Sequence, residues 1–241
     1  MKFGVIGYGS FGKLLAEVLA KHGEVMVYSK NEKEKPAWDN VSFASFEDTA
    51  KADIVILAIG LESLDNVSKR LAGLVHKKTV VVDVCSVKQK PIEILTNNLG
   101  GKCRILPTHP LFGPYTVKDG SFAGKKMVLC PFDFKGRDKI MDFLKNRLEL
   151  DVIEMSAEDH DREMAWVHGL TFFVGRGLMK LNPPKGGLTT GYYQKLLDLV
   201  ELESTHSIEL FNTVQRGNPF ASEIRQRLIK ELEEIDREIE D

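Results

Sequence analysis

The chain has 241 residues, which is enough to bury a large core, and we expect two domains. Its 33 basic and 35 acidic residues leave a net charge of −2, which excludes the basic footprint of a nucleic-acid binder and favours a small-molecule partner. The three cysteines, an odd number without metal-ligand spacing, predict neither disulfides nor a metal site and fit a reducing compartment such as the cytoplasm.

The N-terminal sequence predicts no targeting or anchoring segment. The chain opens directly on a strand, without a basic leader followed by a cleavable apolar segment. No apolar run reaches the roughly 18 residues that span a bilayer. We therefore expect no membrane partner, and a plastid location only for a chain from which a transit peptide has been removed.

The first predicted strand, Lys2 to Ile6, leads into a glycine-rich turn and then into a helix. Gly7 permits a tight turn, Gly9 lets the backbone approach a pyrophosphate, and Gly12 lets the helix pack against the strand. The helix N-terminus adds free N–H groups and the positive end of its dipole. This context predicts a dinucleotide site formed by Gly7, Tyr8, Gly9, Ser10, Phe11 and Gly12.

The second predicted strand, Glu24 to Tyr28, bears on the choice of cofactor. It is followed by Ser29, Lys30 and Asn31, where an NAD-preferring site usually carries an acidic residue for the ribose 2′-hydroxyl. The Ser29 hydroxyl and the Lys30 ammonium would instead favour a 2′-phosphate. We therefore expect NADP, with NAD as the alternative and Lys30 as a solvated loop charge as the competing interpretation.

Further β-branched runs alternate with helical patterns along the first part of the chain. Asp53 to Ile59 and Thr79 to Val84 predict buried strands, and His109 is expected at the end of a further strand. This alternation is typical of a mostly parallel sheet that is covered on both faces. Because ligands lie beyond the carboxyl ends of such strands, Ser86 and His109 are expected to converge near the cofactor.

The sheet is expected to end with two more strands around a helix. Lys126 to Cys130 and Asp151 to Met155 predict the strands, and Lys135 to Leu148 predicts the helix. Beyond them the pattern becomes helical throughout, with helices expected over Met164 to Leu181, Tyr192 to Gln215 and Pro219 to Ile239. The first of these is apolar on more than one face, which favours burial against other helices or a second subunit.

These patterns predict an α/β chain of two domains. Residues 1–155 would form a Rossmann-type domain with a mostly parallel sheet that binds the dinucleotide. Residues 156–241 would form an all-helical domain that binds substrate. A helical tail of this size is small for a core of its own, so a homodimer through the helical domain is expected.

The segment Thr108 to Pro114 reads Thr-His-Pro-Leu-Phe-Gly-Pro and contains the candidate base. Proline pushes the preceding residue towards extended geometry, so His109 is expected at a strand end and not in a helix. An imidazole with an ordinary pKa of about 6.5 can accept a proton near neutral pH, and the Ser86 hydroxyl can orient it. His109 as a structural corner and Ser86 as a helix N-cap are the alternatives.

Four features in the same order resemble the prephenate and arogenate dehydrogenases of tyrosine biosynthesis. They are the glycine turn, Asp83 to Lys88 (Asp-Val-Cys-Ser-Val-Lys), Thr108 to Pro114, and the Asp-His-Asp of residues 159 to 161. The resemblance covers nearly the whole chain. It implies an oxidative decarboxylation in which hydride leaves ring C4 for the nicotinamide while carbon dioxide leaves C1.

The resemblance also implies roles for single residues. His109 matches the catalytic histidine of the family, Ser86 matches a residue that assists it, and His168 lies where members place a substrate-contacting histidine. A histidine on an apolar helix is equally often a core residue, so both interpretations of His168 stay open.

The chain departs from the family at the group that binds the ring carboxylate. Many microbial relatives carry an arginine in the helical domain and an acidic partner after the His-Pro motif. Here residues 191–200 contain no arginine, and Tyr115 stands at the acidic position. Carboxylate binding then falls to other candidates, which are Lys195, Gln194, Tyr192 and Arg176.

A second departure bears on the choice of substrate. Plant-type relatives carry an acidic residue that favours the amino group of arogenate, and His206 stands there by hand alignment. A histidine supplies no carboxylate for an ammonium, which favours prephenate. An alignment that placed Glu203 or Glu209 there would reverse this inference.

Two other functions stay open. One is another two-domain nicotinamide oxidoreductase, such as a β-hydroxyacid dehydrogenase or an imine reductase, although no isolated lysine or aspartate stands out as its proton donor. The other is a regulatory protein that binds the nucleotide without turnover.

Overall fold

The computed structural model describes residues 1–30, 38–117, 119–132 and 134–240. The chain divides into two compact units, Met1–Ala157 and Glu158–Asp241. Among the described residues, no helix combines the length and the apolar character needed to cross a membrane.

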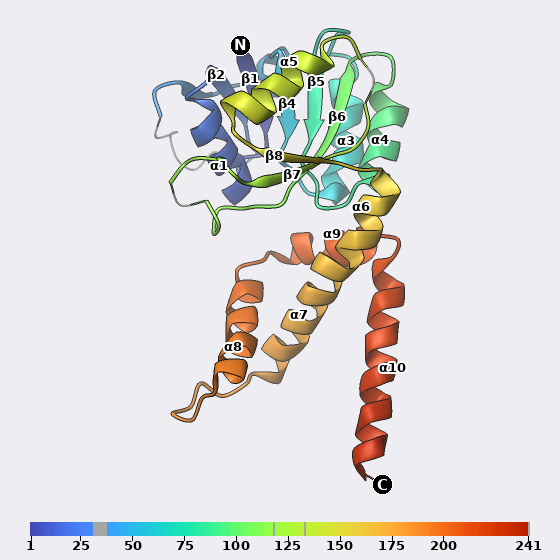
Figure 1. The fold of residues 1–241 in the computed structure, drawn as a ribbon. Helices are drawn as coiled ribbons and strands as arrows, with labels where there is room; N and C mark the ends of the chain where they lie inside the picture. Colours follow the sequence, from blue (N-terminus) through green and yellow to red (C-terminus); the bar gives the residue numbers. More distant parts are fainter. Residues whose placement is uncertain (31–37, 118, 133, 241) are drawn as a thin grey trace. The chain divides into compact units, whose positions relative to one another are not determined.

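An eight-stranded sheet with the order β3-β2-β1-β4-β5-β6-β7-β8 forms the centre of the first unit (Figure 1). The strands are β1 (Lys2–Ile6), β2 (Glu24–Tyr28), β3 (Val41–Phe43), β4 (Ile54–Leu57), β5 (Val80–Asp83), β6 (Arg104–Pro110), β7 (Lys126–Leu129) and β8 (Asp151–Glu154). All neighbours pair in parallel except β6 and β7, which are antiparallel. The predicted mostly parallel sheet is confirmed.

Helices pack on both faces of this sheet. They are α1 (Ser10–Leu19), α2 (Phe46–Thr49), α3 (Leu61–Leu71), α4 (Gln89–Leu99), α5 (Arg137–Asp142) and the π-helix η1 (Phe143–Arg147). One apolar cluster joins the sheet to α1 and η1, and a second joins it to α2, α3 and α4. The sequence patterns missed β3 and α2, because elements of three or four residues are too short to show a period.

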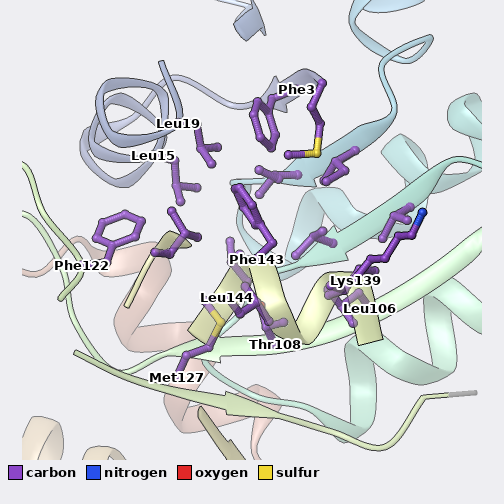
Figure 2. Close-up of a pocket in the computed structure, with 18 residues that line it drawn as sticks. Phe3, Leu15, Leu19, Leu106, Thr108, Phe122, Met127, Lys139, Phe143 and Leu144 are labelled. Carbon is purple, nitrogen blue, oxygen red and sulfur yellow. The ribbon is translucent and has the colours of Figure 1, made fainter. Parts of the chain in front are cut away.

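A cavity of about 160 Å³ lies between the sheet and the layer formed by α1, α5 and η1 (Figure 2). Its lining is apolar apart from Thr108 and Lys139, and includes Phe3, Leu106 and Phe143.

The second unit is helical. Its elements are α6 (Ala157–Met164), the π-helix η2 (Ala165–Leu170), α7 (Thr171–Leu181), α8 (Gly191–Ser204), α9 (Ile208–Gly217) and α10 (Ala221–Glu240). The single helix predicted over Tyr192 to Gln215 is wrong, because Ser207 starts a new helix by accepting a hydrogen bond from the Leu210 N–H at 3.1 Å. Serine and threonine side chains around residue 205 favour such caps over a continuous helix.

Large apolar side chains remain exposed on several of these helices. They are Trp166, Val167, Leu181, Tyr192, Leu196, Leu202, Ile208, Ile229, Leu232, Ile235 and Ile239, together with Leu188 in the α7–α8 connection. Within one chain, the apolar side chains predicted for this region are therefore only partly buried.

Candidate active site

The glycine turn after β1 is shaped by close backbone packing. Gly7 has a φ of +105°, and a Cβ atom there would lie 2.2 Å from the carbonyl oxygen of Ala58. A Cβ at Gly12 would lie 2.1 Å from the carbonyl oxygen of Gly7. Gly12 thus lets the helix pack against the turn itself, and both positions require glycine.

Gly9 lies in open space at the start of α1. It is exposed, and a Cβ atom there would meet nothing within 4 Å. As the N-cap it offers no side-chain bond to the first turn, which contains no acidic residue. The N–H groups and positive dipole end of α1 are therefore available, and they fit the pyrophosphate of a dinucleotide.

The other predicted cofactor residues of the turn differ in their surroundings. Ser10 is exposed beside Gly9, whereas the Tyr8 ring packs edge-on against Phe43 at 5.2 Å. The Phe11 ring faces Phe112 at 6.2 Å. The two aromatic rings thus tie the turn to neighbouring parts of the first unit.

Ser29 and Lys30 follow β2 directly beside the glycine turn. The last residue of β2, Tyr28, is paired with Ile6 and accepts a hydrogen bond from the Gly7 N–H at 2.9 Å. Ser29 is half-buried and Lys30 is exposed. Asn31 lies outside the described residues.

Ser86 lies in the connection between β5 and α4 and is half-buried. The helix begins at Gln89 and its N-cap is Lys88, so the interpretation of Ser86 as the helix N-cap is wrong. Two residues separate Ser86 from the helix, which leaves the hydroxyl in the loop at the carboxyl end of β5.

His109 is the penultimate residue of β6 and is 3% exposed. It lies opposite Val128 of the antiparallel β7, and the Leu111 N–H donates to the Lys126 carbonyl at 2.9 Å just beyond it. Since β5 and β6 are neighbours in parallel, Ser86 and His109 are both carried at the carboxyl end of adjacent strands.

The loop after His109 is closed by Thr116. Its hydroxyl accepts from the Gly113 N–H at 3.0 Å, and the Thr116 N–H donates to the Gly113 carbonyl at 3.0 Å. Tyr115, the predicted substitute for an acidic residue, is 58% exposed in this loop.

Sequence reasoning missed the functional context of Asp83 and Lys88, which form an ion pair with side chains at most 1% exposed. The Lys88 ammonium also donates to the Thr108 carbonyl at 2.5 Å. The signal was available, because an aspartate and a lysine interrupt an otherwise apolar segment. Burial and the nearby Asp83 charge raise the pKa of the Cys85 thiol to about 12, which disfavours the reactive thiolate.

In the helical unit, Phe172 brings two predicted substrate residues together. The His168 ring stacks on Phe172 with centroids 5.1 Å apart, and the His206 ring lies 4.3 Å from the same side chain. Burial, with His160 and His206 nearby, lowers the pKa of His168 to about 4. His168 is therefore neutral at physiological pH.

Glu203 is a buried carboxylate. In the sequence it was considered only as an alternative to His206 at the aligned position. It accepts a hydrogen bond from Nε of Arg176 at 2.8 Å, and its other oxygen lies 3.1 Å from Nδ1 of His206. Arg176 also lies over the Phe211 ring at 4.7 Å. Arg176 is a candidate for binding the substrate carboxylate. Its charge is already compensated by Glu203.

The other residues that could bind the substrate carboxylate are Tyr192, Gln194 and Lys195. They lie at the start of α8, whereas Glu203 lies at its end. Gln194 donates to Asp198 at 2.8 Å, and the Lys195 ammonium lies over the Tyr192 ring at 5.8 Å. The side chains of Tyr192, Gln194, Lys195 and Asp198 are all exposed. The structure does not bring them next to His168 and His206.

A family model described as prephenate dehydrogenase, nucleotide-binding domain, matches residues 15–151. A second model, described as TYRAAT1-like, C-terminal domain, matches residues 178–241. The chain is 30% identical to arogenate dehydrogenase 2, chloroplastic, of Arabidopsis thaliana, over 99% of this chain and 70% of the relative. It is 31% identical to arogenate dehydrogenase 1, chloroplastic, of the same plant, over 94% of this chain but only 37% of that relative's length.

Solved structures show the same fold. A prephenate dehydrogenase from A. aeolicus, in complex with hydroxyphenyl propionate and NAD+, matches with a TM-score of 0.76 and 22% identity, over 100% of this chain and 92% of that chain. Synechocystis arogenate dehydrogenase matches with a TM-score of 0.70 and 20% identity, over 99% and 93%. The resemblance indicated by the sequence is confirmed, and the chain belongs to the prephenate and arogenate dehydrogenase family.

Proposed function

We propose that this chain catalyses the NADP-dependent oxidative decarboxylation of prephenate, with arogenate as the alternative substrate, in tyrosine biosynthesis. The observation that carries the proposal is the placement of Ser86 and His109 at the carboxyl ends of adjacent strands, on the unit that contains the glycine turn. Family membership and the names of the relatives support the same reaction.

A dinucleotide held at the glycine turn of Gly7, Gly9 and Gly12 would supply the acceptor for the hydride of ring C4. His109 removes the proton of the C4 hydroxyl as the carbonyl forms, and Ser86 orients the imidazole. The bond between C1 and the carboxylate then breaks, its electron pair completes the aromatic ring, and carbon dioxide leaves. His109 returns its proton to the resulting phenolate, so the histidine ends as it began.

The base assignment is tested by His109→Asn. We expect kcat to fall about 10²–10⁴-fold, which is the usual contribution of a positioned base, while the Kd for NADP stays within twofold. His76→Asn, on an exposed histidine of the same unit, is the matched control. An undiminished kcat in His109→Asn would refute the assignment.

A side-by-side assay tests substrate and cofactor together. Reduced-nicotinamide absorbance is followed with prephenate or arogenate and with NADP or NAD. We expect the highest kcat/KM for prephenate with NADP. NADP binding without turnover of either substrate would favour the regulatory protein, and turnover of a β-hydroxyacid or an imine alone would favour another oxidoreductase.

The preference for prephenate rests on His206 and Glu203. An ammonium needs an acceptor, but the only carboxylate described against His206 is Glu203, whose charge is compensated by Arg176. His206→Asp should therefore raise kcat/KM for arogenate relative to prephenate. The contacts of substrate with His168, Lys195, Gln194 and Tyr115 are part of the same proposal, each tested by its effect on KM after alanine substitution.

We also propose a homodimer that forms through the helical unit. On α10, Leu232, Ile235 and Ile239 are spaced by three and four residues and are exposed, which gives an apolar stripe along one side of the helix. Leu232→Glu should shift the molar mass in light scattering from two chains to one. Gln226→Glu, on an exposed polar position of α10, is the control, and a wild-type monomer would refute the dimer. The cytoplasm is the proposed compartment, with the plastid as the alternative for a chain from which a transit peptide has been removed.

A further inference from the structure

The parallel ladder between β5 and β6 stops just before the candidate base. Its last pair is Asp83 with Pro107, and a proline brings no N–H to a ladder. From Thr108 onward the strand pairs with β7, where His109 lies opposite Val128. The two halves of β6 thus belong to different strand pairs, and His109 lies beyond the pairing with the strand that leads to Ser86.

Where the backbone ladder ends, hydrogen bonds from side chains connect β5 and β6 instead. The Thr108 hydroxyl donates to the backbone carbonyl of Asp83 at 2.7 Å. The Lys88 ammonium bonds both the Asp83 carboxylate and the Thr108 carbonyl. All three residues are at most 1% exposed, so neither charge has water to replace a lost partner.

The same carboxylate fixes the loop that carries Ser86. The Cys85 N–H donates to Oδ1 of Asp83 at 2.9 Å, directly before Ser86. Lys88 follows Ser86 by two residues and bonds the same Asp83 carboxylate. Ser86 is therefore bracketed in sequence by two groups that are attached to Asp83.

We propose that Asp83, Lys88 and Thr108 form a positioning clamp that sets Ser86 and His109 relative to each other. The proposal rests on the proposed function, because it takes these two residues as the catalytic pair. The members of the clamp are buried, so they act through the backbone at Cys85 and Thr108 and not on substrate. A displacement of about 1 Å at a reacting group can cost roughly 10²-fold in rate, so the connection matters to catalysis.

The first test is Thr108→Val, which removes one hydroxyl bond and no charge. We expect kcat to fall at least tenfold, with KM for NADP within twofold and with the far-UV circular dichroism of the wild type. Thr108→Ser restores a hydroxyl and should recover most of kcat. A folded Thr108→Val enzyme with kcat within twofold of wild type would overturn the proposal.

The matched control is Thr79→Val. Thr79 is equally buried and lies just before β5, at the opposite end of that strand from Asp83, with its hydroxyl 3.3 Å from the His76 ring. It should keep wild-type kcat at a similar cost in Tm. If kcat falls by the same factor in both valine variants, the effect is one of general stability and the clamp is refuted.

A second measurement separates the clamp from the proposed function. The ring resonances of His109, assigned in NMR spectra by their absence from His109→Asn, should shift in Thr108→Val and stay in place in Thr79→Val. Unchanged resonances in Thr108→Val would refute the clamp whatever the activity. If wild type and His109→Asn have the same kcat, the proposed function fails, and shifted resonances would still support the clamp.

The ion pair is tested by removing both charges at once. Asp83→Asn with Lys88→Met avoids the lone buried charge that either single change would leave. We expect the double variant to fold and to lose kcat by at least the factor found for Thr108→Val. A double variant with wild-type kcat would contradict a positioning role for the pair.

Discussion

The rings of Phe11 and Phe112 lie 6.2 Å apart, which joins the glycine turn to the segment that carries His109. Phe112 also packs against Phe122 at 4.7 Å. Aromatic side chains bury large areas and hold defined mutual orientations. Two motifs about one hundred residues apart in sequence are thus in contact within the first unit.

Gly9 and Gly12 should respond differently to alanine. A Cβ at Gly9 meets open space, so Gly9→Ala should fold with a change of at most about 1 kcal/mol while KM for the cofactor rises at least tenfold. Gly12→Ala must push its Cβ away from the Gly7 carbonyl and should lose about 1–3 kcal/mol of unfolding free energy. Urea unfolding and cofactor titration separate the two effects, and equal behaviour would contradict this division of roles.

Lys30 should affect NADP more than NAD. Because a 2′-phosphate gains a charge-assisted bond from the ammonium, Lys30→Ala should raise KM for NADP about tenfold and leave KM for NAD within twofold. Lys77→Ala, on another exposed lysine, should change neither constant. A wild-type enzyme that prefers NAD would disprove the assignment.

His168 should make stability depend on pH. Its pKa is lowered from 6.5 to about 4, so the unfolded chain binds this proton more readily than the folded one. The free energy of unfolding should therefore fall as pH drops from about 6.5 towards 4, by at most about 3 kcal/mol. At higher pH, this group should cause no change of the unfolding free energy with pH.

Urea unfolding between pH 5 and 7.5 checks this dependence, followed by Trp166 fluorescence in a Trp38→Phe background. His168→Gln should flatten the slope, whereas His76→Gln in the other unit should not. Parallel profiles for His168→Gln and its parent would count against a neutral, buried His168.

The cavity of Figure 2 should accept one more methyl group. Val82 lines it, so Val82→Ile should raise the unfolding free energy by about 0.5–1 kcal/mol. Val81 faces the tightly packed opposite side of β5, where the same substitution should cost about 1–3 kcal/mol. Thermal unfolding of both variants measures the contrast, and a loss at Val82 would mean that the cavity is smaller than described.

The parts that the sequence predicted are those with a local cause. The strand, glycine turn and helix around Gly7 and Gly12 follow from residue types at fixed spacing, and the prolines around His109 fix an extended backbone. For the same reason the mostly parallel sheet could be predicted from alternating β-branched and helical runs.

The parts that could not be predicted depend on which side chains meet across elements. Asp83 stands out in the sequence as a charge in an apolar segment, whereas Glu203 looks like an ordinary acidic residue. In both cases only the fold shows which cation the buried carboxylate meets. The reversal of β7 and the helix break before Ser207 likewise depend on tertiary packing and on capping, which outweigh periodicity.

The change of strand partner at Pro107 divides the sheet into an inner and an outer part. Ser86 and the glycine turn belong to the strands from β5 inwards, whereas His109 is paired to β7, which is in turn paired only to β8 on its far side. Strands near an edge open more readily than central ones. Heating should therefore separate the base from the rest of the catalytic machinery first, so that activity is lost at temperatures where the circular dichroism of the helices is still intact.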